Sequence, residues 1–172
     1  TWRLQTGDND EQIVDVTMTP ATEGDDVTTI RGAIHDITER RERQQDLQRL
    51  QQAIDGADVP ITLADPSKED DPLVYVNDAF ERVTGYPPEK ALGRNCRFLQ
   101  GDGTDPEKIT ALRDAIDSQE PITVELRNYR KDGTEFCNRL TVTPIYDDRG
   151  QLVRYLGTQE DITERKEREQ KL

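Results

Sequence analysis

The chain has 172 residues, of which 32% are hydrophobic, so it is long enough for one domain with its own core and a substantial attachment. Its 36 acidic residues outnumber its 23 basic residues and give a net charge of −13, which argues against direct nucleic-acid binding, because phosphate recognition needs concentrated Lys and Arg. No segment approaches the ~20 apolar residues of a membrane-spanning helix, and we expect a cytoplasmic protein.

Only 6 of the 23 basic residues are Lys, and 17 are Arg. An acidic, lysine-poor surface suits very high salt, where the Debye length falls to ~3 Å and acidic self-repulsion is screened. We therefore favour a halophilic source over an ordinary acidic protein. No signal peptide is visible, and the opening TWRLQTGDND resembles the interior of a longer protein.

The first predicted element is a strand at 13–18, bounded by a polar run before it and by Pro20 after it. A polar turn and a second short strand follow, and this part ends in the pentapeptide DITER at 36–40. The same order of a T-x-T-P segment, a turn, a strand with one glycine and DITER recurs near the end of the chain, at 141–165.

This repeat predicts the domain organisation. With one inserted residue in the second copy, residues 1–40 match 125–165. Residues 1–35 are therefore predicted to be the C-terminal strands of one domain, a partial strand meander that precedes a whole related domain at 57–160.

A linker helix is predicted between the two copies, at 36–56, because this segment is rich in helix formers and has no Gly or Pro before Gly56. Asp36 and Glu39 have the spacing of a capping box, and the second DITER segment repeats it. Three apolar residues have heptad-like a/d/a spacing: Leu47, Leu50 and Ile54. This seam is compatible either with a solvated linker helix or with pairing to another copy in a homodimer.

The second domain is predicted to contain five strands, three helices and a final charged helix. The hairpin signal Lys131-Asp132-Gly133 joins two of the strands. The strands are expected at 61–64, 73–76, 122–130, 136–143 and 152–159, the helices at 77–84, 89–92 and 106–118, and the final helix at 161–172. This order predicts the α+β class with a five-stranded antiparallel sheet.

One segment carries a specific chemical signal: residues 93–101 read GRNCRFLQG. This resembles the G-x-N-C-R-F-L-Q signature of the LOV (light-oxygen-voltage) family of blue-light-sensing PAS domains, and the resemblance extends over about 59–163. It implies a PAS fold with short helices around a pocket that holds a flavin non-covalently in the dark. It also implies that blue light drives a reversible bond between the sulfur of Cys96 and flavin carbon C4a.

The resemblance also assigns flavin contacts. Arg97 and Arg113 would hold the phosphate, and Arg suits this because its planar fork pairs with two phosphate oxygens. Amide side chains match the donors and acceptors along the flavin edge. The implied cofactor contacts are Asn95, Arg97, Gln100, Ile109, Arg113, Asn128, Asn138, Leu140 and Gln159.

Side-chain alternation separates the two cysteines in this interpretation. Asn138 and Leu140 share one strand face, so Cys137 points to the other face and is a poor candidate for bonding to the flavin. The first copy has apolar residues opposite the three amides of the second, and it is not expected to bind flavin through them: Leu4, Val14 and Ile34 stand opposite Asn128, Asn138 and Gln159.

The chain departs from plant-type members at two positions, with Ala64 where many carry Thr and Leu140 where many carry Phe. Family members that take FAD commonly have an insertion near the segment between Gln100 and Pro106, which is short here, so FMN is favoured over FAD. Because Gln159 is two residues before Asp161, we expect the light signal to leave through the last strand toward the final helix and an effector whose nature the sequence does not indicate.

Two other classes of function remain open. One is a PAS scaffold that pairs subunits without photochemistry, and the other is a flavin redox sensor or flavoenzyme. The sequence has no C-x-x-C spacing, phosphate loop or Ser/His/Asp set, so we expect neither a metal site nor enzymatic activity.

Overall fold

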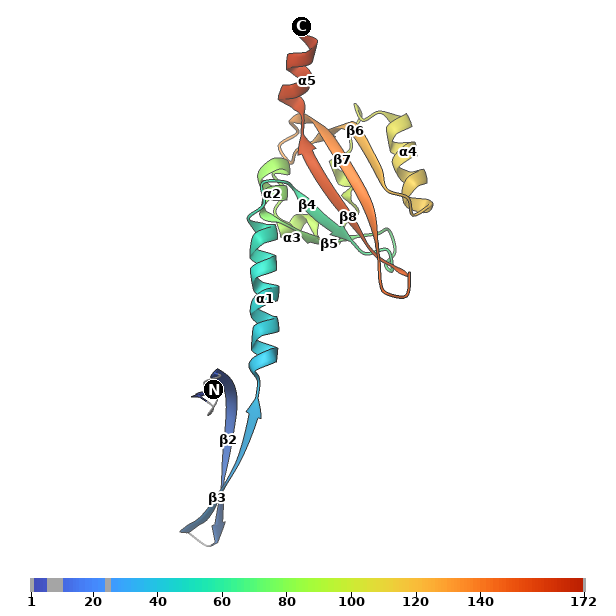
Figure 1. Ribbon diagram of the computed structural model, residues 1–172. Helices are drawn as coiled ribbons and strands as arrows, with labels where there is room; N and C mark the ends of the chain where they lie inside the picture. The colour runs from blue at the N-terminus through green and yellow to red at the C-terminus, as the bar shows by residue number, and fades with distance from the viewer. Residues whose placement is uncertain (1, 6–10, 24–25, 172) are drawn as a thin grey trace. The chain divides into compact units, whose positions relative to one another are not determined.

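The computed structural model describes residues 2–5, 11–23 and 26–171. The chain divides into two compact units, Thr1–Gln52 and Ala53–Leu172. Both appear in Figure 1, the first from blue to cyan and the second from cyan to red.

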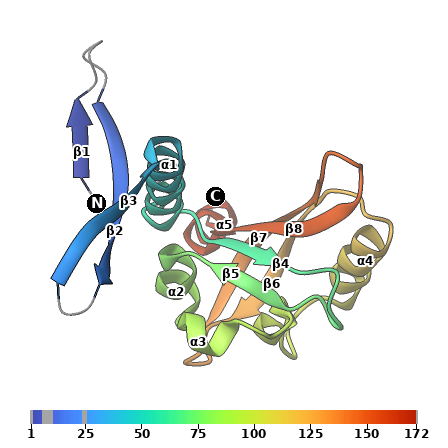
Figure 2. The same ribbon diagram turned by 90° about the horizontal axis from the view of Figure 1, so that it is seen from below.

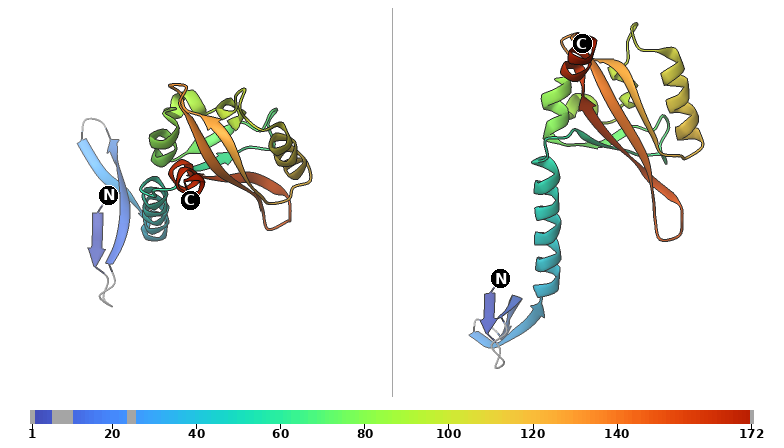
Figure 3. Two further views of the ribbon diagram at one scale, coloured as in Figure 1. Left: turned by 90° about the horizontal axis from the view of Figure 1, so that it is seen from above. Right: turned by 45° about the horizontal axis from the view of Figure 1, so that its top comes forward.

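The first unit is a three-stranded antiparallel sheet followed by most of a long helix (Figure 3). The sheet has the order β1-β2-β3, and its elements are β1 Trp2–Gln5, β2 Glu11–Glu23, β3 Asp26–Asp36 and α1 Thr38–Asp55. β2 runs through Pro20, beyond the predicted end at residue 18. Among the described residues, Pro20 pairs only with β3, so the missing N–H of the proline can face the other edge of the strand.

The second unit holds a five-stranded antiparallel sheet in the order β5-β4-β8-β7-β6. Its strands are β4 Ile61–Ala64, β5 Leu73–Val76, β6 Ile122–Tyr129, β7 Glu135–Tyr146 and β8 Leu152–Asp161. The last strand lies at the centre, between the first strand and the hairpin formed by β6 and β7. The predicted α+β class and the five-stranded sheet are confirmed.

Helices α2, α3 and α4 lie on one face of this sheet (Figure 2). The helical elements are α2 Asp78–Thr84, α3 Pro88–Ala91, the 3₁₀ helix η1 Cys96–Leu99, α4 Pro106–Asp117 and α5 Thr163–Gln170. Asn77 caps α2 by accepting a bond from the Phe80 N–H, and Gly85 ends it in the left-handed conformation. The 3₁₀ helix η1 was not predicted from the sequence.

The capping prediction is wrong in its detail. The Asp36 carboxylate accepts bonds from the N–H and hydroxyl of Thr38, at 2.9 and 2.6 Å, and the helix starts at Thr38. Asp161 and Thr163 repeat this arrangement before α5. A carboxylate that bonds two residues ahead forms an Asx-type turn, which places the helix start later than a capping box would.

The two copies of the repeat share this strand-to-helix junction in atomic detail. Thr38 Oγ1 accepts the N–H of Ile13 at 2.9 Å, and Thr163 Oγ1 accepts the N–H of Cys137 at 2.9 Å. The strand registers also correspond, because Leu4 pairs with Gln12 as Asn128 pairs with Phe136. Likewise, Val16 pairs with Ile34 as Leu140 pairs with Gln159. Counted from this common register, Leu4, Val14 and Ile34 stand at the positions of Asn128, Asn138 and Gln159.

Candidate functional site

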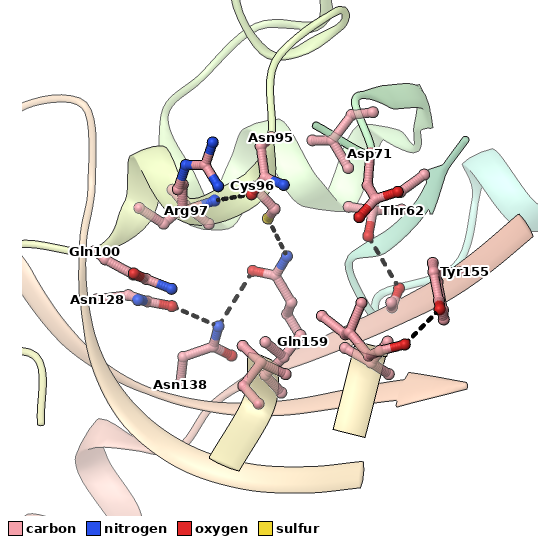
Figure 4. A pocket seen from close by; sticks show the side chains of 18 of the residues that line it. Thr62, Asp71, Asn95, Cys96, Arg97, Gln100, Asn128, Asn138, Tyr155 and Gln159 are labelled. Atoms are coloured by element: carbon pink, nitrogen blue, oxygen red, sulfur yellow. Dashed lines mark hydrogen bonds between the residues drawn. The ribbon is translucent and has the colours of Figure 1, made fainter. Parts of the chain in front are cut away.

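A cavity of about 110 Å³ lies between the helix-covered face of the five-stranded sheet and the segment that carries η1 and α4 (Figure 4). One water molecule needs only ~10–15 Å³ on this measure, so the space can admit a larger ligand. Its polar lining residues are Thr62, Asp71, Asn95, Cys96, Arg97, Gln100, Asn128, Asn138, Tyr155 and Gln159. Most of the remaining lining is aliphatic, from Ala64, Leu73, Leu99, Leu112, Ile116, Leu126, Leu140 and Val142.

Cys96 begins η1 and lines this cavity. The side chain of Asn95 caps the short helix by accepting the N–H of Arg97 at 3.0 Å, which fixes the backbone around the cysteine. Across the cavity, Gln159 Nε2 donates to Cys96 Sγ at 3.7 Å (Figure 4). Burial raises the pKa of the Cys96 thiol to about 12, and the hydrogen bond from Gln159 only partly opposes this. At neutral pH the sulfur is therefore a thiol.

Three buried amides face the cysteine from three adjacent strands. Asn128, Asn138 and Gln159 are 3%, 1% and 1% exposed. Asn138 Nδ2 donates to Asn128 Oδ1 at 2.8 Å and to Gln159 Oε1 at 3.3 Å (Figure 4).

The buried Asn138 Oδ1 has no hydrogen-bond partner among the residues that the structure describes. Buried polar atoms are normally paired, so this acceptor indicates a donor from a bound group. The ring N–H at the polar edge of a flavin is such a donor, and the neighbouring amides match the other atoms of that edge. The residues present therefore fit a flavin ring.

Gly157 on β8 lines the cavity next to Thr62 on β4. Gly157 lies beneath Thr62, whose hydroxyl donates to the Gly157 carbonyl at 3.4 Å. A Cβ at position 157 would come within 2.4 Å of Thr62 Oγ1, so any larger residue would have to displace the Thr62 side chain. The two positions that depart from plant-type members, Ala64 and Leu140, both line the cavity.

Ile109 and Arg113 lie outside the inner cavity, in an adjoining mouth that also includes Asn95, Arg97 and Gln100. All ten predicted site residues, the nine cofactor contacts and Cys96, therefore line the cavity or its mouth. The acidic residues of the mouth were not predicted from the sequence. They are Asp70, Asp71 and Asp117.

Asp70 forms an ion pair with Arg97, so the arginine assigned to the phosphate already has an acidic partner. Burial raises the pKa of the Asp71 carboxyl, and the negative charges of Asp70 and Asp117 add to this effect. The acidic run at 69–71 was the only signal for Asp70 and Asp71 in the sequence, and it does not indicate their position beside Arg97.

Cys137 lies on the opposite face of β7, as side-chain alternation predicted. It adjoins the start of α5, where its N–H donates to Thr163 Oγ1 at 2.9 Å, and it shares a surface hollow with Lys166. It does not line the cavity that holds Cys96.

Within residues 2–5, 11–23 and 26–171, no three His, Cys, Asp or Glu side chains are grouped so as to hold a metal ion. In the same described ranges, every helix is too short or too polar to cross a bilayer.

Known proteins resemble this chain along most of its length. The sequence profile of the PAS domain family matches residues 1–39 and 58–164. A blue-light photoreceptor from Listeria monocytogenes is 48% identical over 111 residues, which are 64% of this chain and 44% of that protein. A bacterioopsin transcriptional activator from Halobacterium salinarum is 39% identical over 145 residues, which are 84% of this chain and 21% of that protein.

The solved structure of an RNA-binding light-oxygen-voltage receptor superposes with a TM-score of 0.68 at 38% identity, over 92% of this chain and 42% of that one. The chain thus spans less than half the length of each of these relatives. Together with the fold and the Cys96 cavity, these matches show that the chain belongs to the PAS domain family and contains a PAS domain of the LOV type, the blue-light-sensing class.

Proposed function

We propose that the second unit binds FMN and senses blue light through a reversible bond between Cys96 Sγ and flavin carbon C4a, without enzymatic activity of its own. The observation that carries this proposal is a cavity in which the half-buried Cys96 thiol faces a row of buried amides, with one amide oxygen unpaired among the described residues. When bound, the flavin supplies the blue-light absorption and the carbon atom to which the sulfur adds.

The flavin ring would lie in the cavity and the phosphate-bearing chain in its mouth. Asn128, Asn138 and Gln159 would face the polar edge of the ring, and Leu140 would pack against it. The phosphate and the chain that carries it would lie in the mouth, bound by Asn95, Arg97, Gln100, Ile109 and Arg113. Because Gln159 and Cys96 are hydrogen-bonded to each other, a ring placed between them must replace that bond.

The loop after η1 supports FMN over the larger FAD. Gly103 N–H donates to the Tyr129 hydroxyl at 2.9 Å, and Thr104 Oγ1 donates to the Arg127 carbonyl at 2.7 Å. A Cβ at Gly101 would lie 2.5 Å from the Tyr129 ring, which shows how closely the loop lies against β6. A short loop fixed at this position leaves little freedom to rearrange around an adenine group.

The first unit and the two flanking helices complete the proposal. We assign residues 1–35 to the C-terminal strands of a preceding PAS domain, 36–56 to a linker helix, 57–160 to the flavin-binding domain, and 161–172 to the start of a signalling helix. We also propose a homodimer through α1, whose apolar seam is exposed: Leu47, Leu50 and Ile54 are 63%, 62% and 40% exposed. The relative from Halobacterium salinarum is consistent with a halophilic source.

The test is the bleaching of the flavin absorption band near ~450 nm in blue light. The purified chain should be yellow and should bleach reversibly. Cys96→Ala should keep the flavin and lose the bleaching, because the carbon–sulfur bond needs the thiol. Cys137→Ala is the matched control and should bleach like wild type. Bleaching that survives in Cys96→Ala would disprove the role of Cys96, and a wild-type protein that never bleaches would favour a PAS scaffold or redox sensor.

A further inference from the structure

The mouth of the cavity contains an unexpected balance of charge. Two arginines, Arg97 and Arg113, share it with three aspartates: Asp70, Asp71 and Asp117. If all five side chains are charged, the mouth carries a net charge of −1 within a chain whose net charge is −13. A phosphate that enters this mouth therefore meets repulsion as well as attraction.

Asp70 is positioned beside Arg97 by hydrogen bonds of its loop backbone as well as by the ion pair between the two side chains. The loop closes through a bond from Asp65 N–H to the Pro72 carbonyl at 3.0 Å. Asn95 Nδ2 donates to the Asp70 carbonyl at 2.7 Å, and the same Asn95 side chain accepts the Arg97 N–H. Asp70 and Arg97 are thus fastened to one asparagine through their backbones.

The backbone at this point adopts an uncommon conformation. Asp70 has φ of 70° and Asp71 has φ of 45°, in the left-handed region that residues other than glycine rarely adopt. The turn directs the Asp70 carboxylate to the Arg97 guanidinium. Arg113, by comparison, is exposed and forms no ion pair with any residue that the structure describes.

We propose that Asp70 is a specificity-determining residue that competes with the flavin phosphate for Arg97. This proposal rests on the proposed flavin site and adds a ligand preference to it. Because Arg97 must give up or share its carboxylate partner, the phosphate contributes less to binding than two arginines would otherwise provide. The site therefore discriminates only weakly between FMN and riboflavin, which is the same flavin without the phosphate.

Ionic strength should change this preference. Salt screens the repulsion between the phosphate and the negatively charged mouth, so FMN should gain affinity relative to riboflavin as salt rises. A mouth with a net positive charge would show the opposite trend, because salt would then weaken the attraction.

The experiment titrates the full chain, freed of flavin, with FMN and with riboflavin, and follows the flavin fluorescence. In Asp70→Asn the ratio of FMN affinity to riboflavin affinity should rise about two- to fivefold at low salt, the scale of one half-exposed ion pair. Asn also tolerates the left-handed backbone, so the loop should keep its shape.

Two variants control the result. Glu69→Gln removes the same charge from the adjacent residue, which lines neither the cavity nor the mouth among the residues described, and it should leave the ratio near wild type. In an Arg97→Ala background, the effect of Asp70→Asn should shrink to that of this control, because the competition acts through Arg97.

Each outcome is decisive for one of the two proposals. An unchanged or lowered ratio in Asp70→Asn overturns the competition, and so does a full effect that persists without Arg97. Intact riboflavin binding in all variants keeps the flavin site itself valid in those cases. A wild-type chain that binds neither flavin contradicts the proposed function, and the role of Asp70 with it.

Discussion

Gln159 lines the cavity and lies close to the C-terminal end of the last strand, where α5 begins. Its side chain contacts Cys96 and Asn138. Its backbone N–H donates to the Pro60 carbonyl at 3.0 Å, in the segment between α1 and β4. Two residues later, Asp161 forms the turn that begins α5. A change in the hydrogen bonds of Gln159 can therefore reach both flanking helices through a short path.

We predict that Gln159→Leu separates the photochemistry from the structural response. If the proposed bond between Cys96 Sγ and flavin C4a forms, the thiol proton would pass to flavin N5, and Gln159 would then face a hydrogen-bond donor in place of an acceptor. The Gln159 amide can restore the hydrogen bond by rotating, so that its oxygen accepts from N5. Without this rotation, the amide N–H and the flavin N–H would be two buried donors facing each other, at a cost of ~1–3 kcal/mol. That energy can bias a two-state contact by roughly 5- to 150-fold.

Leu has nearly the size of Gln but cannot make either hydrogen bond. The variant should still bleach in light, yet the light-dependent change in hydrogen exchange over 155–172 should largely disappear. Asn128→Leu, which removes an amide of the same row from β6, should keep that change. A change of wild-type size in Gln159→Leu means that the signal takes another route.

For single residues, the sequence predicted the placement of the two cysteines and the amides better than it predicted the charged groups around them. The motif around Cys96 and side-chain alternation along β7 placed the thiol and Asn138 on one side and Cys137 on the other. The partner of Arg97 could not be predicted, because Asp70 is 27 residues away and reaches it only through a loop with two left-handed residues. Local patterns do not encode such a contact.

Among the elements, α5 contacts the outer face of the sheet through ion pairs to one carboxylate, in addition to the bond between Thr163 and β7. Glu125 on β6 accepts bonds from Lys166 Nζ at 2.7 Å and from Arg165 at 3.0 Å, both on α5. Arg139 on β7 binds the same group at 3.0 Å. The bonds from Lys166 and Arg139 lower the pKa of the Glu125 carboxyl to about 2 from its ordinary value of 4.5. The carboxylate therefore keeps its charge, and its hold on α5, at neutral pH.

Glu125→Gln should loosen α5 without disturbing the flavin site. We expect hydrogen exchange over 163–170 to rise a few-fold in the dark, with unchanged bleaching at Cys96. Because the lowered pKa stabilises the folded form only above the ordinary value, this contribution is complete above pH ~5 and is lost as the pH falls toward 2. Wild type and variant should then converge in acid.

The control for this change is Glu160→Gln, which removes an acid that pairs with Arg139 and with neither Arg165 nor Lys166 among the described ion pairs. It should leave the exchange of α5 close to that of wild type. Equal exchange in wild type and Glu125→Gln would show that the Thr163 turn alone holds the helix.

The strands were predicted well because alternation and the Lys131-Asp132-Gly133 hairpin signal are local. Their boundaries were less certain, as the extension of β2 through Pro20 shows, since a strand edge decides whether a proline is tolerated. The short helix η1 escaped prediction because its four residues carry no periodicity, and the cap from Asn95 defines it only in three dimensions.

For the whole molecule, the net charge of −13 sets the conditions for assembly. Two copies that pair must overcome mutual repulsion, which is long-range at low salt and screened at high salt. The apolar seam of α1 favours pairing, because burying its exposed leucines against a second copy removes apolar surface from water. Dimerisation should therefore strengthen as salt rises.

The last prediction tests this assembly with one substitution on each side of α1. Leu50→Glu places a charge in the proposed seam and should shift the chain toward monomer in molar KCl, because a buried unpaired charge is costly. Gln52→Glu adds the same charge two residues away, about 200° around the helix from Leu50, and should leave the dimer intact. Sedimentation of both variants against wild type, in low salt and in molar KCl, measures the effect. A wild-type chain that stays monomeric at high concentration in molar KCl, or an equal loss in both variants, would place the pairing surface elsewhere than on Leu47, Leu50 and Ile54.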